Sequence, residues 1–321
     1  MRTLIPYAAA AGPQCQQALA TLQLPQLKQL LQLLTLTSRR AGNPQHLTPL
    51  HERIVAQFMG LEGDDGLIPW AALDAQRLGL TALHGGDGWA WITPCHWTLQ
   101  SDHASMADPL QLALTGKDAE ALWQAMQPYF QEDGITLFVH ALGHSSTRWL
   151  AHGAVFKDLP TASLDRVGGH TVDAWMPRQE QAKTLRRLQN EMQMLLYTHP
   201  VNDARAKFKL DSVNSFWVSG TGSLPANALS PPHDPPACTV RDALRGPALQ
   251  DHALLWCEAW EALDSTTLSQ LVEQASAGQP VWLTLCGELQ AITLENRPLG
   301  LAQRLRRRWT PLQPSALLGT L

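Results

Sequence analysis

Charged residues are scarce in this sequence. Lys, Arg, Asp and Glu together make up 16% of its 321 residues, against 45% for apolar residues. Disordered chains show the opposite balance, so we expect a folded protein, and the length suits two domains or one large α/β unit. A formal net charge of -4 offers no general attraction to phosphate backbones or anionic lipids. We therefore expect neither nucleic acid nor a membrane as a partner.

Long apolar runs and paired cysteines are also missing. No segment approaches the roughly 18 consecutive apolar residues that span a bilayer. The first residues, MRTLIPYAAAAGPQC, contain Pro6 and lead into a Gln-rich amphipathic segment, which disfavours a secretory signal. The 5 cysteines are scattered and form no C-x-x-C pair, a pattern typical of a reducing compartment. The sequence thus predicts a cytoplasmic protein with free thiols.

Two segments have a distinctive composition. Arg304-Leu305-Arg306-Arg307-Arg308 is the one basic cluster, and Leu301, Leu305 and Trp309 recur there at helical spacing. We interpret it as the solvated face of a helix and not as a phosphate-binding patch. Residues 223–237, SLPANALSPPHDPPA, are rich in proline and predict an irregular linker or a surface loop.

Hydrophobic spacing and breaker residues predict an α/β fold, with a mixed sheet and flanking helices. We divide the chain into a mainly helical N-terminal region (1–84), an α+β module (85–176) and an α/β region (177–321). In the last third, a helix between two strands favours a parallel βαβ crossover, and Gly287-Glu288 favours an antiparallel hairpin after it. The expected helices are 14–37 with a break at Pro25, 49–59, 70–78, 118–130, 179–197 and 265–277. Residues 3–8 are expected to be a short strand or an extended segment, and the other expected strands are 88–99, 135–140, 149–150, 213–219, 253–259, 281–285 and 289–294.

Polar side chains are unusually dense between Leu185 and Gly222. On the expected helix, Arg187 and Glu191 lie one turn apart and can pair. The planar guanidinium of Arg205 suits a carboxylate or a phosphate, so this segment predicts a site for a small anionic ligand. Our candidate ligand-binding residues are Glu191, His199, Asn202, Arg205, Asn214 and Ser219.

A structural interpretation of the same segment stays open. A protonated His199 at a helix C-terminus would satisfy the final carbonyls, and the chain itself could satisfy the amide of Asn214. The strand end Gly220-Thr221-Gly222 leaves backbone amides approachable, as phosphate-binding turns do. No Lys follows it and Pro225 obstructs a helix, which excludes a Walker or dinucleotide loop.

Other polar groups suggest a metal or a nucleophile only weakly. Spacing of this kind is unspecific, so we assign no metal ligands and no catalytic residues, and we expect no cofactor unless a divalent metal binds. Cys95 lies among tryptophans and is interpreted as core. Trp217, Trp256 and Trp260 are interpreted as core residues that could also line a pocket. The possible metal ligands are His96, Asp102, His103 and Asp108, with Asp64, Asp65 and Asp87 before them, and His140, His144 and His152 are interpreted as exposed hairpin residues.

Several sequence blocks resemble a known family. The blocks are LRRLQNEMQMLLYTHPVND, VNSFWVSGTG, WITPCHW with DHASMADP, and AMQPYFQEDGITL. Over residues 85–290 they are similar to poorly understood proteobacterial proteins labelled cofactor-independent phosphoglycerate mutase, or regulatory protein of the RpfE type. The resemblance implies a degenerate core like that of alkaline phosphatase and phosphoglycerate mutase. The mutase label implies two divalent metals and a nucleophilic serine.

The residues that such chemistry needs are not found in this sequence. It has no early strand that ends in Asp-Gly, no Asn-Ser-Glu block, and no late Asp-His-Gly or His-x-x-x-His pair. We therefore expect a non-catalytic or regulatory protein that binds a small ligand. The alternatives are a metal-dependent phosphoryl-transfer enzyme like phosphoglycerate mutase, with its ligands at unrecognised positions, and a module that binds a protein partner through exposed Trp and the proline-rich segment.

Overall fold

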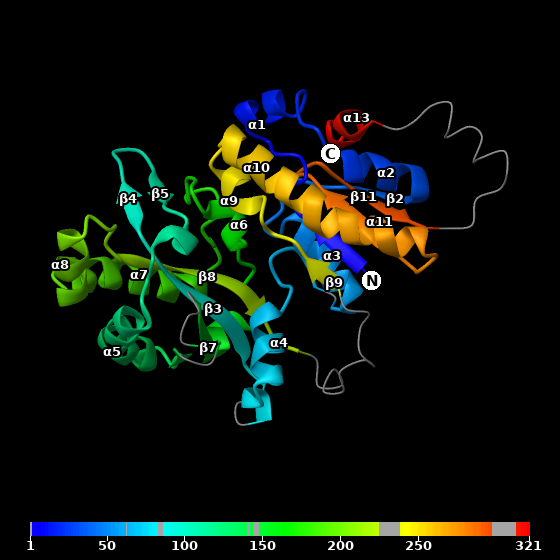
Figure 1. Cartoon of the computed structure of the whole chain (residues 1–321). Helices are drawn as coiled ribbons and strands as arrows, with labels where there is room; N and C mark the ends of the chain where they lie inside the picture. The colour runs from blue at the N-terminus through cyan, green and yellow to red at the C-terminus, as the bar shows by residue number, and fades with distance from the viewer. Residues whose placement is uncertain are drawn as a thin grey trace. The chain divides into compact units, whose positions relative to one another are not determined.

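The protein is a mixed α/β structure, shown as a computed structural model in Figure 1. The structure describes residues 2–61, 63–82, 86–139, 142–143, 148–224, 238–296 and 313–321. The chain forms two compact units. Unit 1 is Met1–Gln45, Pro49–Gly60 and His233–Leu321, and unit 2 is His46–Thr48 and Leu61–Pro232. The boundaries expected near residues 84 and 176 differ from this division, because the first strand of the chain pairs with strands from the last third.

The sheet of unit 1 has the strand order β2-β11-β10-β1-β9. Strand β1 runs parallel to both of its neighbours, whereas β10, β11 and β2 are successively antiparallel. The hairpin expected around Gly287-Glu288 is confirmed as the β10–β11 connection. The strands are β1 (Arg2–Ile5), β2 (Thr35–Ala41), β9 (Cys238–Val240), β10 (Trp282–Cys286) and β11 (Gln290–Glu295).

Helices cover both faces of this sheet, as Figure 1 shows for α10 and α11 on one face. Successive strand residues point to opposite faces, so Ile5 and Leu285 pack against one helical layer while Leu4 and Cys286 pack against α3 on the other. The helices are α1 (Pro13–Ala18), α2 (Pro25–Leu33), α3 (Leu50–Phe58), α9 (Arg245–Leu249), α10 (Ala253–Leu263), α11 (Ser269–Ser276) and α13 (Pro314–Leu318), with a π-helical segment, Asp264–Leu268, between α10 and α11.

Two expectations about unit 1 were wrong. Residues 253–259 are helix α10 and not a strand, because Trp256, Trp260 and Leu263 recur at helical spacing and form its buried face. The parallel partner of β10 is therefore β1. Helix α2 ends at Leu33, and the exposed edge strand β2 follows where a helix was expected.

Unit 2 is built around an antiparallel sheet with the order β6-β7-β3-β8 and a separate β4–β5 hairpin. The expected strands around residues 88–99, 135–140 and 149–150 are confirmed, with a break at His96. The strands are β3 (Gly88–Cys95), β4 (Trp97–Leu99), β5 (Ala104–Met106), β6 (Thr136–Phe138), β7 (Trp149–Gly153) and β8 (Ser215–Gly222).

The long helices of unit 2 pack on this sheet through a shared apolar core. Helix α7 buries Leu185, Leu188, Met192 and Leu196 at the spacing that predicted it. The helices are α4 (Trp70–Arg77), α5 (Gly116–Glu132), α6 (Leu164–Val167), α7 (Ala182–Tyr197) and α8 (Pro200–Lys207). Among the described residues, none of the helices has the length and apolar character needed to cross a bilayer.

Candidate functional site

Two of the predicted ligand-binding residues, Asn202 and Asn214, are bonded to the backbone. The Nδ2 group of Asn202 donates to the carbonyls of Leu196 and Val213, both at 2.8 Å, and its Oδ1 accepts from the Val213 amide at 2.8 Å. The Asn214 side chain accepts from the Trp97 amide at 2.7 Å and donates to the Trp97 carbonyl at 2.8 Å. These bonds tie the segment before β8 to α8 and to β4. For Asn214 they agree with the structural interpretation, in which the chain itself satisfies the amide.

Arg205 is buried within unit 2. Its Nε donates to the Asp211 carbonyl at 2.7 Å, and a second guanidinium nitrogen donates to the Leu112 carbonyl. The third nitrogen lies 3.8 Å from a carboxylate oxygen of Asp118. The guanidinium that suggested an anionic ligand is thus surrounded by protein acceptors, and its ligand role stays a prediction.

The other three predicted residues have separate surroundings. Glu191 accepts from Arg187 at 2.8 Å, so the pair expected one turn apart on the helix is confirmed. His199 does not cap the C-terminus of α7. Its Nδ1 accepts from the Val201 amide at 3.3 Å and so caps the start of α8, which begins at Pro200. Ser219 is buried in β8 opposite Trp91 of β3. A ligand role for these residues stays a prediction.

The strand end Gly220-Thr221-Gly222 is enclosed by protein. A β-carbon on Gly220 would lie 2.7 Å from the Trp91 ring, and φ is +62° there, so the position needs glycine. The Thr221 hydroxyl donates to the Leu159 carbonyl at 2.6 Å. The space beside this turn is therefore filled by side chains and backbone of unit 2.

The possible metal ligands bond to different parts of unit 2. His96 bonds through Nδ1 to the Ser212 carbonyl at 2.8 Å, and Asp65 accepts from the Leu47 amide at 2.8 Å. His103 and Asp102 pair with each other at 2.7 Å on the β4–β5 hairpin. Cys95 is fully buried, as expected, and burial raises the pKa of its thiol. His140, His144, the run 304–308 and most of the proline-rich segment, 225–237, lie outside the described residues.

A pocket of about 480 Å³ lies in unit 1, at the edge of the sheet where the parallel strands β1 and β10 end. The amide of Ala8, just after β1, donates to the carbonyl of Cys286 at the end of β10 at 2.8 Å, which holds these two strand ends together. Ligands of open α/β sheets commonly bind at the carboxyl ends of parallel strands, and the volume suits a small molecule.

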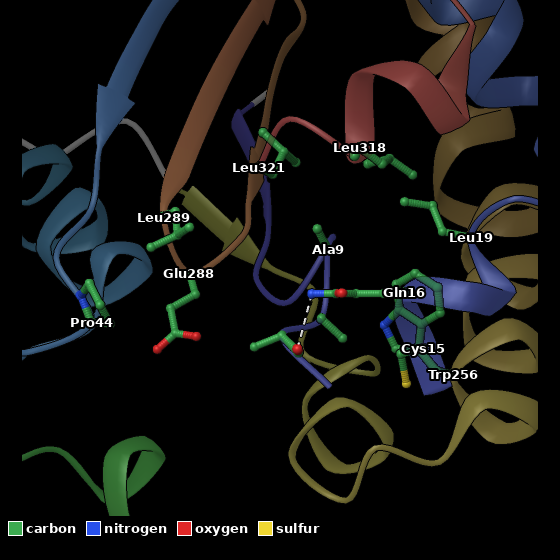
Figure 2. A pocket seen from close by; sticks show the side chains of 13 residues that line it. Ala9, Cys15, Gln16, Leu19, Pro44, Trp256, Glu288, Leu289, Leu318 and Leu321 are labelled. Carbon is green, nitrogen blue, oxygen red and sulfur yellow. Dashed lines mark hydrogen bonds between the residues drawn. The ribbon is translucent and has the colours of Figure 1, made fainter. Parts of the chain in front are cut away.

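Most groups that line the pocket are apolar (Figure 2). Trp256 of α10 is buried, and its indole Nε1 donates to the Tyr7 carbonyl at 3.2 Å. Gln16 of α1 donates through its side-chain amide to the Ala11 carbonyl at 3.0 Å. The lining residues are Ala9, Ala10, Ala11, Cys15, Gln16, Leu19, Pro44, Trp256, Glu288, Leu289, Leu318, Gly319 and Leu321.

Helix α1 is positioned against the pocket by a carboxylate from the other end of the chain. Asp251, just before α10, accepts from the amides of Gln14 at 3.1 Å and Cys15 at 2.9 Å in the first turn of α1. These amides have no acceptor within the helix, so the carboxylate acts as a cap. The amides hold the pKa of Asp251 below its ordinary value, the Cys15 amide most strongly.

The thiol of Cys15 lines the pocket but is not activated. Burial is the main cause that raises its pKa to about 12, and the neighbouring Asp251 carboxylate raises it further. Because the thiolate is the nucleophile and the metal-binding form, a thiol with this pKa stays protonated near neutral pH.

The pocket does not fit the metal and serine chemistry that the mutase label implies. The side chains of its described lining include one carboxylate, Glu288, and one protonated thiol, Cys15, and none of them belongs to Ser, Thr, Asp or His. Two divalent metals need several carboxylate or imidazole ligands, and a phosphoryl-carrying site needs a hydroxyl nucleophile. The described lining is instead that of a binding pocket.

Comparisons with known proteins do not show a family for this chain. No family profile and no curated protein matches it. Among solved structures, the PH0037 protein from Pyrococcus horikoshii aligns with a TM-score of 0.45 at 11% identity, over 92% of this chain and 87% of that one. A cofactor-independent phosphoglycerate mutase from Thermoplasma acidophilum aligns with a TM-score of 0.35 at 14% identity, over 92% and 89%. These scores are too low to bear on chemistry, and the proteobacterial resemblance stays a prediction.

The pocket was not predicted from the sequence, apart from the suggestion that Trp256 could line one. Its walls come from the segment after β1, from α1, from the β10–β11 hairpin and from α13. A run of alanines and scattered leucines carries no chemical signature, so only the parallel pairing of β1 with β10 brings these residues together. The one sequence signal was the run Ala8–Ala11 directly after the first strand, whose small side chains leave space at a strand end.

Proposed function

We propose that this protein is a non-catalytic small-molecule-binding protein and that its ligand occupies the pocket of unit 1. The observation that carries the proposal is the position of an apolar cavity at the carboxyl ends of β1 and β10. A few polar groups on an otherwise apolar wall are the usual composition of small-molecule sites. A regulatory role, in which binding changes the state of the protein, is part of this proposal.

The described lining offers no activated thiol or hydroxyl nucleophile, which supports binding over catalysis. Cys15 is held as a thiol, and the Gln16 amide already donates to the Ala11 carbonyl. General acid or base catalysis needs a titrating group with a pKa near the working pH. The polar groups described at this pocket can orient a ligand through hydrogen bonds, and this is the role that we assign to them.

A screen for ligand-induced stabilisation tests the proposal. A compound that binds only the folded state raises the unfolding free energy, by about 2.7 kcal/mol at a hundredfold excess over its Kd. We expect such compounds to raise the Tm of the unaltered protein, and to lose this effect in Ala9→Phe, where the added ring fills the pocket. Ala20→Phe is the matched control, because Ala20 is exposed and is not part of the lining.

Two outcomes would contradict this function. Stabilisation that survives in Ala9→Phe places the ligand elsewhere. Turnover of phosphoglycerates by purified protein with added Mn²⁺ supports the phosphoryl-transfer alternative, and loss of that turnover on substitution of a metal-binding residue would establish it.

A further inference from the structure

Residues 314–321, which form one wall of the pocket, are bonded to the sheet at a single point. The carbonyl of Leu321 accepts from the amides of Leu289 at 3.1 Å and Gln290 at 2.7 Å, where β11 begins. Among the described residues, the other hydrogen bonds of this segment stay within it or go to Gln313. The polar connection between the segment and the β10–β11 hairpin therefore depends on one carbonyl group.

A glycine in the hairpin makes room for this carbonyl. A β-carbon on Gly287 would lie 2.6 Å from both the carbonyl carbon and the carbonyl oxygen of Leu321, and its three nearest heavy atoms all belong to Leu321. Gly287 is not among the glycines with a positive φ, so its backbone conformation is open to alanine. A methyl group at this position would therefore act mainly by disturbing the docking of Leu321.

The same segment covers one side of the pocket. Leu318, Gly319 and Leu321 are lining residues, and Figure 2 draws Leu318 and Leu321 above Ala9. Leu317, Leu318 and Leu321 are buried in the core of unit 1. Helix α13 has 5 residues, too few to be stable in water without this packing. The segment therefore keeps its shape only while it is docked, and we expect it to dock and leave as one unit.

We propose that residues 314–321 form a lid, and that release of the Leu321 carbonyl from the hairpin opens the pocket to its ligand. This inference rests on the proposed function and adds how the ligand enters. Release frees two amides and exposes the leucines of the segment, while the strands of the sheet stay paired. A bound ligand that touches Leu318 and Leu321 contacts the closed lid, so binding shifts the lid toward its closed state.

Hydrogen exchange of two amides measures the opening of the lid. In the unaltered full-length protein, we expect the amides of Leu289 and Gln290 to exchange at least about tenfold faster than the bonded amides between β1 and β10, after correction for intrinsic rates. The reason is that the lid opens without unfolding of the sheet. The neutral apolar dye N-phenyl-1-naphthylamine serves as the ligand probe, and we expect it to slow the exchange of both amides.

Substitution of the hairpin glycine gives the second readout. Gly287→Ala is expected to speed exchange at Leu289 and Gln290 by about tenfold, because the methyl group forces the docked carbonyl away. The association rate of the dye, followed by stopped-flow fluorescence, should rise with the open fraction. Gly246→Ala is the control, since a β-carbon there meets nothing within 4 Å. If Gly287→Ala is poorly folded, Leu321→Ala, which removes a buried lid side chain and keeps the carbonyl, should show the same two increases.

The outcomes distinguish the lid from the proposed function. Exchange at Leu289 and Gln290 that is as slow as between β1 and β10 would show that the segment is a fixed wall. Faster exchange in Gly287→Ala with an unchanged association rate would place the entry elsewhere. Either result overturns the lid and leaves a binding pocket in place. Failure of the dye to bind counts against the proposed function, whereas the exchange rates still decide whether the segment opens.

Discussion

A β-carbon on Gly12 would lie 2.2 Å from Oδ1 of Asp251. The carboxylate can cap α1 only because the residue before the helix has no side chain. Cys15 and Gln16 lie in α1 and Leu19 follows it directly, and all three line the pocket. Gly12 and Asp251 therefore act together to fix the position of α1, which forms one wall of the pocket.

Replacement of this glycine should weaken the fold. In Gly12→Ala, either the helix or the carboxylate must move, and we expect the unfolding free energy to fall by about 1–3 kcal/mol, the usual cost of forcing an extra methyl into a packed site. Urea unfolding measures the change. Gly246→Ala is the control, since a β-carbon there meets nothing within 4 Å and alanine favours helix α9. Equal effects of the two substitutions would contradict the close approach.

Two helix-capping aspartates should respond to acid in opposite directions. Asp264 accepts from the amides of Gln26 and Leu27 at the start of α2, as Asp251 does for α1. Burial raises the pKa of Asp264, whereas the amides lower the pKa of Asp251. The stability that Asp251 contributes is thus present above pH 3.8, the ordinary pKa of an aspartate, and is lost as the pH falls through its lowered pKa. The stability that Asp264 contributes is present below pH 3.8, its ordinary pKa, and is lost as the pH rises through its raised pKa.

Unfolding of Asp251→Asn and Asp264→Asn across the acid range tests this. As pH falls, the difference from the unaltered protein should shrink for Asp251→Asn. For Asp264→Asn it should shift in favour of the unaltered protein. Parallel pH profiles for the two variants would show that burial does not dominate at Asp264.

The thiol at the pocket should be inert. Because the pKa of Cys15 is raised to about 12, we expect iodoacetamide at mildly alkaline pH to leave it unmodified in the folded protein and to modify it in urea. The stability that the Cys15 thiol contributes is present below pH 9.0, the ordinary pKa of a cysteine, and is lost as the pH rises toward about 12. Cys15→Ala should therefore remove part of the alkaline loss of stability. Mass spectrometry of native protein that shows early alkylation at Cys15 would contradict the burial.

Asn202 should matter for stability. Its side chain makes three hydrogen bonds to backbone groups of Leu196 and Val213. Asn202→Ala removes these three hydrogen bonds and leaves the backbone groups buried without them. We expect a loss of about 2–4 kcal/mol in unfolding free energy, from the cost of unsatisfied buried groups. Asn190→Ala, an exposed asparagine on α7, is the control and should change little. A well-folded Asn202→Ala with altered ligand binding would revive the ligand role that the sequence predicts.

The sequence predicts elements whose pattern is local. The leucine spacing of α7 and the glycine turn between β10 and β11 are both confirmed, because each depends on neighbouring residues alone. The run 253–259 was misassigned because a short apolar segment suits a strand as well as a buried helix.

The candidate site depends on long-range pairing and so was beyond the sequence. Polarity drew attention to Asn202 and Asn214, whose amides turned out to bond to the backbone. Polar side chains attract functional interpretation, but a buried loop needs them to satisfy its own peptide groups. The pocket at β1 has few polar groups, and its walls meet only when residues from both ends of the chain share one sheet.

The central position of β1 has a consequence for synthesis of the chain. Both neighbours of β1 lie beyond unit 2 in sequence, and the caps of α1 and α2 each join residues 237 positions apart. During synthesis, all of unit 2 leaves the ribosome before β9 and β10 do. Strand β1 therefore has neither of its sheet partners until unit 2 has been synthesised. Contacts of such separation form slowly, which makes closure of the sheet around β1 the late step of folding and the step that creates the pocket.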